Sequence, residues 1–154
     1  MNTQSRPLSA ITVAGIIHRA GRFLLVEESI AGQRRFNQPA GHVEPGESLL
    51  DAVVREVREE TRHPFTPEAL LGIYHQNAAS GARILRVSVI GSVGAPDDAP
   101  LDSGILGVHW LSPEALSTPD YPPRSPFVLQ CIQDFLAGER HDLRLLHSLL
   151  APTA

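Results

Sequence analysis

The chain has 154 residues, of which 42% are hydrophobic and 19% are charged, and its formal net charge is −4. This length predicts one domain, 1–154, with residues 1–9 as a loose leader, and the composition argues against an intrinsically disordered chain. We expect no signal peptide and no membrane span, and the one cysteine, Cys131, excludes an internal disulfide, so the cytoplasm is the expected location.

The charged residues are distributed unevenly. All 13 basic residues are arginines scattered along the chain, which argues against a nucleic-acid-binding surface. Six of the 17 acidic residues, by contrast, lie between Glu44 and Glu60, and this segment is where we expect the chemistry. The expected partner is a small-molecule substrate rather than nucleic acid or a membrane. Both a monomer and a homodimer remain open.

The N-terminal part of the chain predicts strands. Three apolar or β-branched stretches are the expected strands: residues 10–18, 22–28 and 35–40. Ala20-Gly21 turns the first of them into the second, which predicts a hairpin. The segment from Gly41 to Gly46 has a proline between its glycines and predicts a loop.

Residues 48–61 form the clearest predicted helix. Ser48 is suited to cap its first turn, with Asp51 three residues later as a weak capping-box partner. Apolar residues recur every three or four positions and form one face of this helix: Leu49, Leu50, Val53, Val54 and Val57.

The remainder of the chain predicts further strands and two helices. Three stretches are the expected strands: residues 70–75, 83–93 and 105–111. Ser112-Pro113-Glu114 opens a short helix, and Pro126 opens a longer one through Ala137. Four residues are expected on the buried side of the longer helix: Phe127, Cys131, Phe135 and Leu136. Strands with helices between and after them indicate an α+β or α/β sandwich.

An acidic face lies on the helix at 48–61. Glu56, Glu59 and Glu60 fall within about 100° of arc, where like charges each cost roughly 0.2–0.5 kcal/mol on an isolated helix. A divalent cation would offset this repulsion, because Mg²⁺ takes oxygen ligands and combines one or two carboxylates with substrate phosphates. The alternative is a solvated face that Arg55 and Arg58 neutralise.

The loop before this helix favours the metal interpretation. Gly41 and Gly46 allow the backbone to approach closely, and Ala40 or Gly41 can offer a carbonyl oxygen to the same cation. Glu47 can fix the helix start by accepting hydrogen bonds from Arg55 or from loop amides. A glycine loop that leads into a carboxylate helix is typical of a site for a metal and a pyrophosphate.

These residues carry a family resemblance. The spacing Gly41-x5-Glu47-x7-Arg55-Glu56-Val57-x-Glu59-Glu60 resembles the Nudix box, G-x5-E-x7-R-E-U-x-E-E-x-G-U, in which U is a bulky aliphatic residue. The resemblance implies an α+β fold, an α/β/α sandwich around a mixed sheet, and an enzyme that hydrolyses phosphoric anhydrides with Mg²⁺, for which Mn²⁺ can substitute.

The resemblance extends beyond the box. The segments FLLVEESIAG, FNQPAGHVEPGESL, HWLSPEAL and RSPFV resemble the NudJ-type phosphatases of this family, which act on nucleoside di- and triphosphates and on a thiamine-pathway pyrimidine pyrophosphate. The chain departs from the box at Arg62 and His63, which replace its last glycine and aliphatic residue. A left-handed Arg62 would cost about 1 kcal/mol, and Pro64 still ends the helix. We therefore expect a structural variation without loss of activity.

The resemblance also implies roles for individual residues. Glu56 and Glu60 would be the principal metal ligands, helped by Glu59 and by the carbonyl group of Ala40 or Gly41. Glu59 or Glu56 is the expected general base. Arg55 would orient the glutamates through charge-assisted hydrogen bonds, and Glu47 completes the predicted catalytic set. Many relatives carry a further carboxylate in the loop before the strand at 105–111, and Asp102 is the remaining candidate for it here.

The predicted substrate-binding residues are Phe36, Asn37, Gln38 and Arg124. The first three lie at the edge of the expected pocket, where they would stack on a base or hydrogen-bond to it. The alternative is that Phe36 belongs to the core and the amides satisfy loop backbone. Arg124 would contact phosphate, whereas Arg34, Arg83 and Arg86 are weaker candidates because surface arginines are mostly solvated.

Two other functions stay open. The substrate can be ADP-ribose or another dinucleotide, since the residues that select it lie in loops such as Gln76 to Gly81. The chain can also be a binding or regulatory module of the same fold that has lost turnover. The second alternative predicts loss of the carboxylates, yet the glutamates of the box and its arginine are all present.

Overall fold

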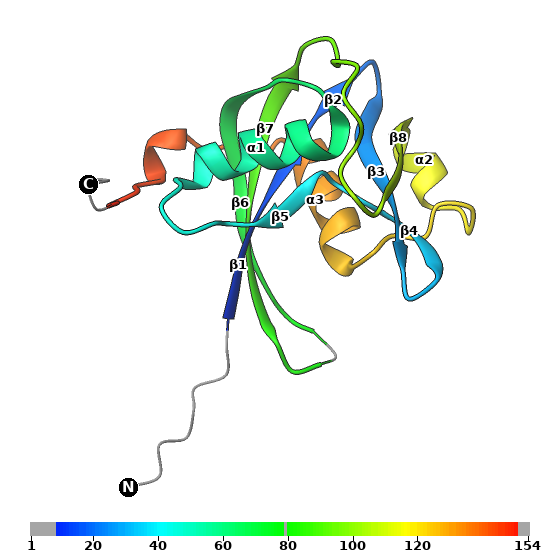
Figure 1. Cartoon of the computed structure of the whole chain (residues 1–154), viewed down its shortest axis with the longest axis horizontal. Helices are drawn as coiled ribbons and strands as arrows, with labels where there is room; N and C mark the ends of the chain where they lie inside the picture. Colours follow the sequence, from blue (N-terminus) through cyan, green and yellow to red (C-terminus); the bar gives the residue numbers. More distant parts are fainter. Residues whose placement is uncertain (1–8, 79, 151–154) are drawn as a thin grey trace, which may run out of the picture.

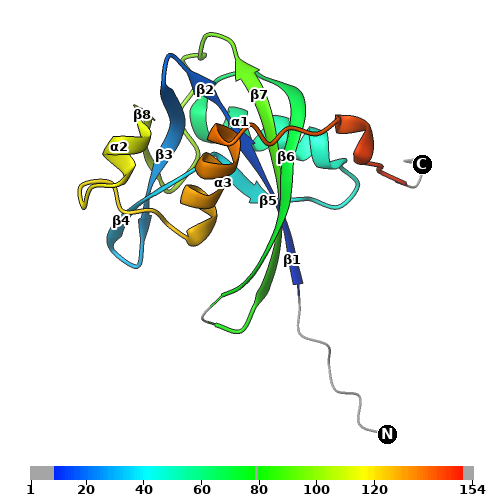
Figure 2. The same cartoon turned by 180° about the vertical axis from the view of Figure 1, so that it is seen from behind.

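The computed structural model describes residues 9–78 and 80–150. Helix α1 (Leu49–Thr61) covers one side of the strands and helix α3 (Pro126–Leu136) covers the other, as the two opposite views show (Figures 1 and 2). This arrangement is the predicted α/β/α sandwich of an α+β protein. No helix in the described ranges is long and apolar enough to span a membrane.

The strands of the described residues form two four-stranded sheets. The first has the order β5-β1-β7-β6 and contains β1 (Ser9–Ile16), β5 (Ala40–His42), β6 (Phe65–Asn77) and β7 (Arg83–Val93). In the second, β3 (Arg22–Ile30) pairs with β2 (His18–Arg19), β4 (Gln33–Asn37) and β8 (Ile105–Leu111). The first sheet is mixed, because β1 runs parallel to β7 and antiparallel to β5. A short helix, α2 (Pro113–Leu116), follows β8, and a 3-10 turn, η1 (Leu143–Leu145), lies near the end.

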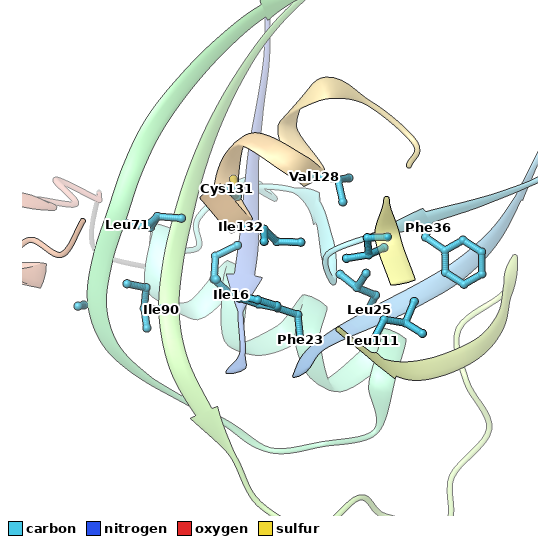
Figure 3. Close-up of a cluster of buried hydrophobic side chains, with 12 residues drawn as sticks. Ile16, Phe23, Leu25, Phe36, Leu71, Ile90, Leu111, Val128, Cys131 and Ile132 are labelled. Atoms are coloured by element: carbon cyan, nitrogen blue, oxygen red, sulfur yellow. The ribbon is translucent and has the colours of Figure 1, made fainter. Parts of the chain in front are cut away.

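Apolar residues on both faces of the strands build two hydrophobic clusters. On β3, Phe23 and Leu25 belong to the cluster under α3, whereas Leu24 between them belongs to the cluster under α1. This division follows from the alternation of side chains along a strand. Figure 3 shows the α3 cluster, in which the helix contributes Val128, Cys131 and Ile132. Burial of each large apolar side chain stabilises the fold by about 1.5–3 kcal/mol before entropy is counted.

The predicted hairpin at 10–28 is largely wrong. Only His18 and Arg19 pair with β3, whereas β1 leaves this hairpin and pairs with β5 and β7. The turn residues Ala20-Gly21 reverse the chain as expected, with Gly21 at a φ of 76°. Turn chemistry is local, but the parallel partner of β1 lies some seventy residues away, beyond the reach of a local pattern.

Three smaller predictions also need correction. The loop predicted from Gly41 begins inside strand β5, and β6 starts at Phe65 rather than at Leu70. Leu136, predicted on the buried side of α3, is 57% exposed. Leu136 is the last residue of α3, and the neighbouring Phe135 takes the packing position against Phe23 and His18 instead.

Helix α1 ends where the box pattern has its last glycine. Arg62 takes the left-handed conformation, with φ 63° and ψ 2°, and its N–H donates to the carbonyl oxygen of Arg58 at 2.8 Å. Its guanidinium donates to the carbonyl oxygen of Pro100 at 2.9 Å and lies 3.2 Å from Asp97. Arg62 thus keeps the left-handed backbone of the glycine in the pattern, and its side-chain contacts offset part of the strain energy.

We predict that Arg62→Gly is more stable than Arg62→Ala by about 1 kcal/mol. Both variants lose the same side-chain contacts, but alanine keeps the left-handed strain of roughly 1–2 kcal/mol, which glycine does not have. The larger conformational freedom of glycine in the unfolded chain cancels part of this advantage. Urea unfolding of the two variants measures the difference. Equal stabilities would contradict the strain at this position.

Candidate active site

Arg55 is the centre of the site at the start of α1. Its Nε and Nη2 donate to the two carboxylate oxygens of Glu47, at 3.0 and 2.6 Å. Nη1 donates to Glu56 at 2.8 Å and to Glu59 at 3.1 Å, and Nη2 also reaches the carbonyl oxygen of His42 at 3.0 Å. The hydrogen bonds predicted between Arg55 and the glutamates are therefore present, and they connect the loop to the helix.

Glu47 is held in its charged form. The hydrogen bond from Arg55 is the main cause that lowers the pKa of this carboxyl, and the N–H of Glu44 donates to the same side chain at 2.7 Å. Both oxygens of Glu47 are occupied, and the side chain does not line the cavity. This geometry fits a positioning residue for Arg55 rather than a proton acceptor.

Glu56 and Glu60 are the buried carboxylates of the helix, with exposed fractions of 8% and 7%. The pKa of Glu60 is raised to about 8, mainly by burial and also by the charges of Glu28, Glu56 and Asp102. The N–H of Ala40, which donates to Glu60 at 2.9 Å, lowers this pKa in part. Burial is also the main cause that raises the pKa of Glu56. Glu56 shares the Arg55 cation with Glu47 and Glu59, and Glu60 has no cation at ion-pair distance among the described residues.

Gly41 is required by the close approach of β5 to the helix. A Cβ atom at this position would lie 2.2 Å from the Cδ and Oε1 atoms of Glu56. A residue with a side chain would therefore displace the carboxylate. The motif glycine leaves the space that Glu56 occupies.

The donor set fits a hard divalent cation, because it consists of carboxylate and carbonyl oxygens with unbalanced negative charge. In the described ranges no three His, Cys, Asp or Glu side chains are already grouped as a metal-binding cluster. Mg²⁺ does not need such a cluster, since it is commonly bound through one or two carboxylates, water and substrate phosphates. Glu56 and Glu60 supply that number.

A cavity of about 720 Å³ opens beside these carboxylates. Its lining combines three buried carboxylates with two arginines: Glu28, Glu56, Glu60, Arg86 and Arg124. Glu59 is absent from the lining, and its side chain is 42% exposed. Only two of the three clustered glutamates of α1 thus face the cavity.

The chain is similar to known proteins in both sequence and structure. The family model described as the NUDIX domain matches residues 7–131. The chain belongs to the Nudix family. It is 34% identical over 137 residues to the phosphatase NudJ of Escherichia coli (strain K12), a match that covers 88% of this chain and 89% of that protein.

Solved structures agree with this assignment. A NUDIX hydrolase from Nitrosomonas europaea aligns with a TM-score of 0.88 at 44% identity, over 92% of this chain and 97% of the other. An ADP-ribose pyrophosphatase from Streptococcus suis aligns with a TM-score of 0.66 at 19% identity, over 88% and 97%, and shows the fold alone. The family and its relatives make this chain a Nudix hydrolase.

In this Nudix hydrolase Phe36 is a core residue, which corrects one predicted contact. It is 0% exposed and packs edge-to-face against Tyr121 and His109, with ring centroids 5.1 and 5.5 Å away. Its ring is not available to stack on a base. The alternative interpretation, a core phenylalanine, is the correct one.

The other predicted substrate residues are placed differently from one another. Asn37 and Arg124 line the cavity. Gln38 is 2% exposed, does not line it, and donates to the carbonyl oxygen of Val128 at 2.9 Å. Gln38 therefore supports the wall of the cavity from behind.

Glu28 is a cavity residue that the sequence reasoning missed. It is 6% exposed, and its carboxylate accepts a hydrogen bond from Nη1 of Arg124 at 2.7 Å, which makes the two an ion pair. A signal was available, because successive residues of a strand point to opposite faces and one of Glu27 and Glu28 had to face inward. A buried acid among apolar strand residues marks the inner wall.

We predict that Gly41→Ala folds with little loss of stability but loses most hydrolysis. The new methyl group meets the flexible end of Glu56, which can move aside at small cost, and this movement takes the carboxylate out of position. Thermal unfolding and steady-state kinetics measure the two effects. Full activity with an unchanged unfolding temperature would contradict the close approach.

We predict that Glu60→Gln becomes more stable relative to the parent protein as the pH rises from about 5 to 8 in EDTA. In this range the folded protein holds the Glu60 proton and the unfolded chain does not, so the parent loses stability with rising pH. The glutamine variant lacks this loss, which is on the order of a few kcal/mol. Unfolding of both proteins at each pH gives the difference, and a flat difference would contradict the raised pKa.

Proposed function

We propose that this Nudix hydrolase cleaves diphosphate linkages in nucleoside di- and triphosphates and related pyrophosphates, with Mg²⁺ as the metal and Mn²⁺ as a substitute. The observation that carries the proposal is the pair of buried carboxylates, Glu56 and Glu60, in the wall of a cavity that also presents Arg124. Buried acids with unbalanced charge favour a cation, and a cation in turn favours phosphate.

The bound metal would neutralise phosphate charge and activate the attacking water. Glu56 and Glu60 offer carboxylate oxygens to it, with the backbone carbonyl group of Ala40 or Gly41 as a further ligand. Arg55 holds Glu56 in place through a 2.8 Å hydrogen bond. The network of Arg55 thus prepares the position of the ligands before substrate binds.

Glu56 is the better of the two predicted general bases. It lines the cavity, and burial raises the pKa of its carboxyl, which makes it a stronger proton acceptor. Glu59 does not line the cavity, and both carboxylates accept a hydrogen bond from Nη1 of Arg55, so the place in the cavity wall distinguishes them. We therefore propose that Glu56 accepts the proton of the attacking water and that Glu59 supports the metal site from outside the cavity.

Arg124 and Asn37 are the proposed substrate contacts. The side chain of Arg124 is 44% exposed and paired with Glu28, so it can reach a phosphate without leaving the cavity wall. Asn37 lies in the same lining and offers its amide to the ligand.

The segments that resemble the NudJ-type phosphatases favour mononucleotides and small pyrophosphates as substrates over ADP-ribose or other dinucleotides, and the 34% identity to a phosphatase of this type supports that resemblance. Retention of the box glutamates, tied together by Arg55, argues against a module without turnover. The cytoplasmic location and the choice between monomer and homodimer stay predictions.

The first test is phosphate release from a panel of nucleoside di- and triphosphates, ADP-ribose, a dinucleoside polyphosphate and the pyrimidine pyrophosphate. Orthophosphate release from the mononucleotides with Mg²⁺ and none with EDTA is the expected result. A preference for ADP-ribose would move the enzyme to the dinucleotide group. No turnover with either metal would support the binding module.

We predict that Glu56→Gln and Glu60→Gln each lose at least about a hundredfold in kcat while the fold stays intact. Glutamine keeps the size of the side chain but removes the charge that binds the metal. Steady-state kinetics and circular dichroism measure these effects. Glu139→Gln, an exposed substitution outside the cavity, is the matched control, and parental activity in either cavity variant would sink the metal assignment.

A further inference from the structure

Arg86, on strand β7, is a buried cation without an acidic partner. It is 5% exposed, lines the cavity, and has no carboxylate at ion-pair distance among the described residues. Nη1 and Nη2 donate to the side-chain oxygens of Gln38 and Asn37, both at 3.2 Å. Nε has no hydrogen-bond partner in the described ranges.

The surroundings of Arg86 do not balance its charge. Two neutral amides, the thiol of Cys131 and the ring of Phe127, 4.9 Å from the guanidinium carbon, lie close to it. Burial raises the pKa of the Cys131 thiol, which therefore brings no negative charge, and Glu28 is already paired with Arg124 at 2.7 Å. Burial is the main cause that lowers the pKa of Arg86; Cys131 and Glu28 act against it, and the charge of Arg124 acts with it. Since a guanidinium stays protonated in proteins, the uncompensated charge remains in the cavity wall.

A second feature of the same wall also favours an anion. Helix α3 begins at this cavity: Ser125, its N-cap residue, and Phe127 in its first turn both line it. The Ser125 side chain makes no capping hydrogen bond. Pro126 has no N–H and the N–H of Val128 donates to the carbonyl oxygen of Ser125 at 3.2 Å, so the N–H of Phe127 is the first-turn donor that the missing cap leaves open. A free N–H group at the positive end of a helix dipole favours phosphate.

We propose that Arg86 and the first turn of α3 form an anion subsite that binds a phosphate group of the substrate. The inference rests on the proposed function, because that function supplies a ligand with more than one phosphate. One phosphate then lies at the carboxylates of α1 and a second at Arg86, on the α3 side of the sandwich. Compounds with a single phosphate fill only one of these positions and bind more weakly.

The test measures binding of orthophosphate and pyrophosphate by calorimetry in EDTA at constant ionic strength. The parent protein is expected to bind both ions without metal, and Arg86→Gln to bind each at least about tenfold more weakly, since hydrogen bonds to charged groups are strong. Arg144→Gln removes an exposed arginine outside the cavity and is the matched control. Equal binding by Arg86→Gln, or no binding by the parent protein, would overturn the subsite.

A measurement on the parent protein covers the case in which Arg86→Gln fails to fold. Phosphate titration is expected to shift the NMR signal of the Arg86 Nε–H, with the same apparent Kd as in calorimetry. The conservative variant Arg86→Lys assigns this signal by its disappearance. A signal that stays fixed at saturating phosphate would contradict the proposal.

Kinetics with Mg²⁺ separate the subsite from the reaction. Arg86→Gln is expected to raise KM at least about tenfold with a kcat within about threefold of the parent, as loss of ground-state binding does. A parent protein that binds phosphate through Arg86 but hydrolyses nothing would remove the proposed function and keep the subsite. Hydrolysis with a KM unchanged by Arg86→Gln would remove the subsite alone.

Discussion

The position of helix α1 relative to strand β5 depends on one guanidinium group. Arg55 donates to three glutamates and to the carbonyl oxygen of His42, so it joins the helix, the loop before it and the end of the strand. Without this cation, Glu56 and Glu59 on the helix and Glu47 in the loop before it would repel one another. The charge of Arg55 is shared among several acids, however, and it leaves Glu60 uncompensated. Arg55 thus stabilises the start of the helix but leaves Glu60, near the end of the helix, without a cation.

The cavity holds charge of both signs without pairing it completely. Glu60 on the α1 side and Arg86 on the α3 side are each buried, and neither is in an ion pair among the described residues. Burial of the Arg86 charge without an acidic partner costs stability, and the raised pKa keeps Glu60 protonated near neutral pH until a cation replaces its proton. The arrangement is stable because two hydrophobic clusters, one under each helix, hold the walls apart. A ligand with a cation at one end and phosphate at the other would satisfy both walls.

The parts of the structure that depend on near neighbours were predictable from the sequence. The span of α1, its Ser48 cap and the box spacing all arise within a few residues, and the structure has each of them. The division into two sheets depends on the pairing of β1 with β7, which no local pattern contains. Arg86 was grouped with solvated arginines because composition alone does not tell which face of a strand is buried. Phe36 looked accessible for the same reason, since its place beside polar residues hides the core that forms around it.

The two glycines at the ends of the box have different physical roles, and this difference explains why one can be replaced. The last glycine position requires a left-handed backbone, which Arg62 adopts at a cost of about 1–2 kcal/mol that contacts with Asp97 and Pro100 partly offset. Gly41 has an ordinary backbone, but the space of its missing side chain is filled by the Glu56 carboxylate. A backbone strain can be compensated elsewhere in the protein, whereas two groups cannot occupy one volume. The departure from the family pattern at Arg62 therefore stays outside the cavity, and a departure at Gly41 would not.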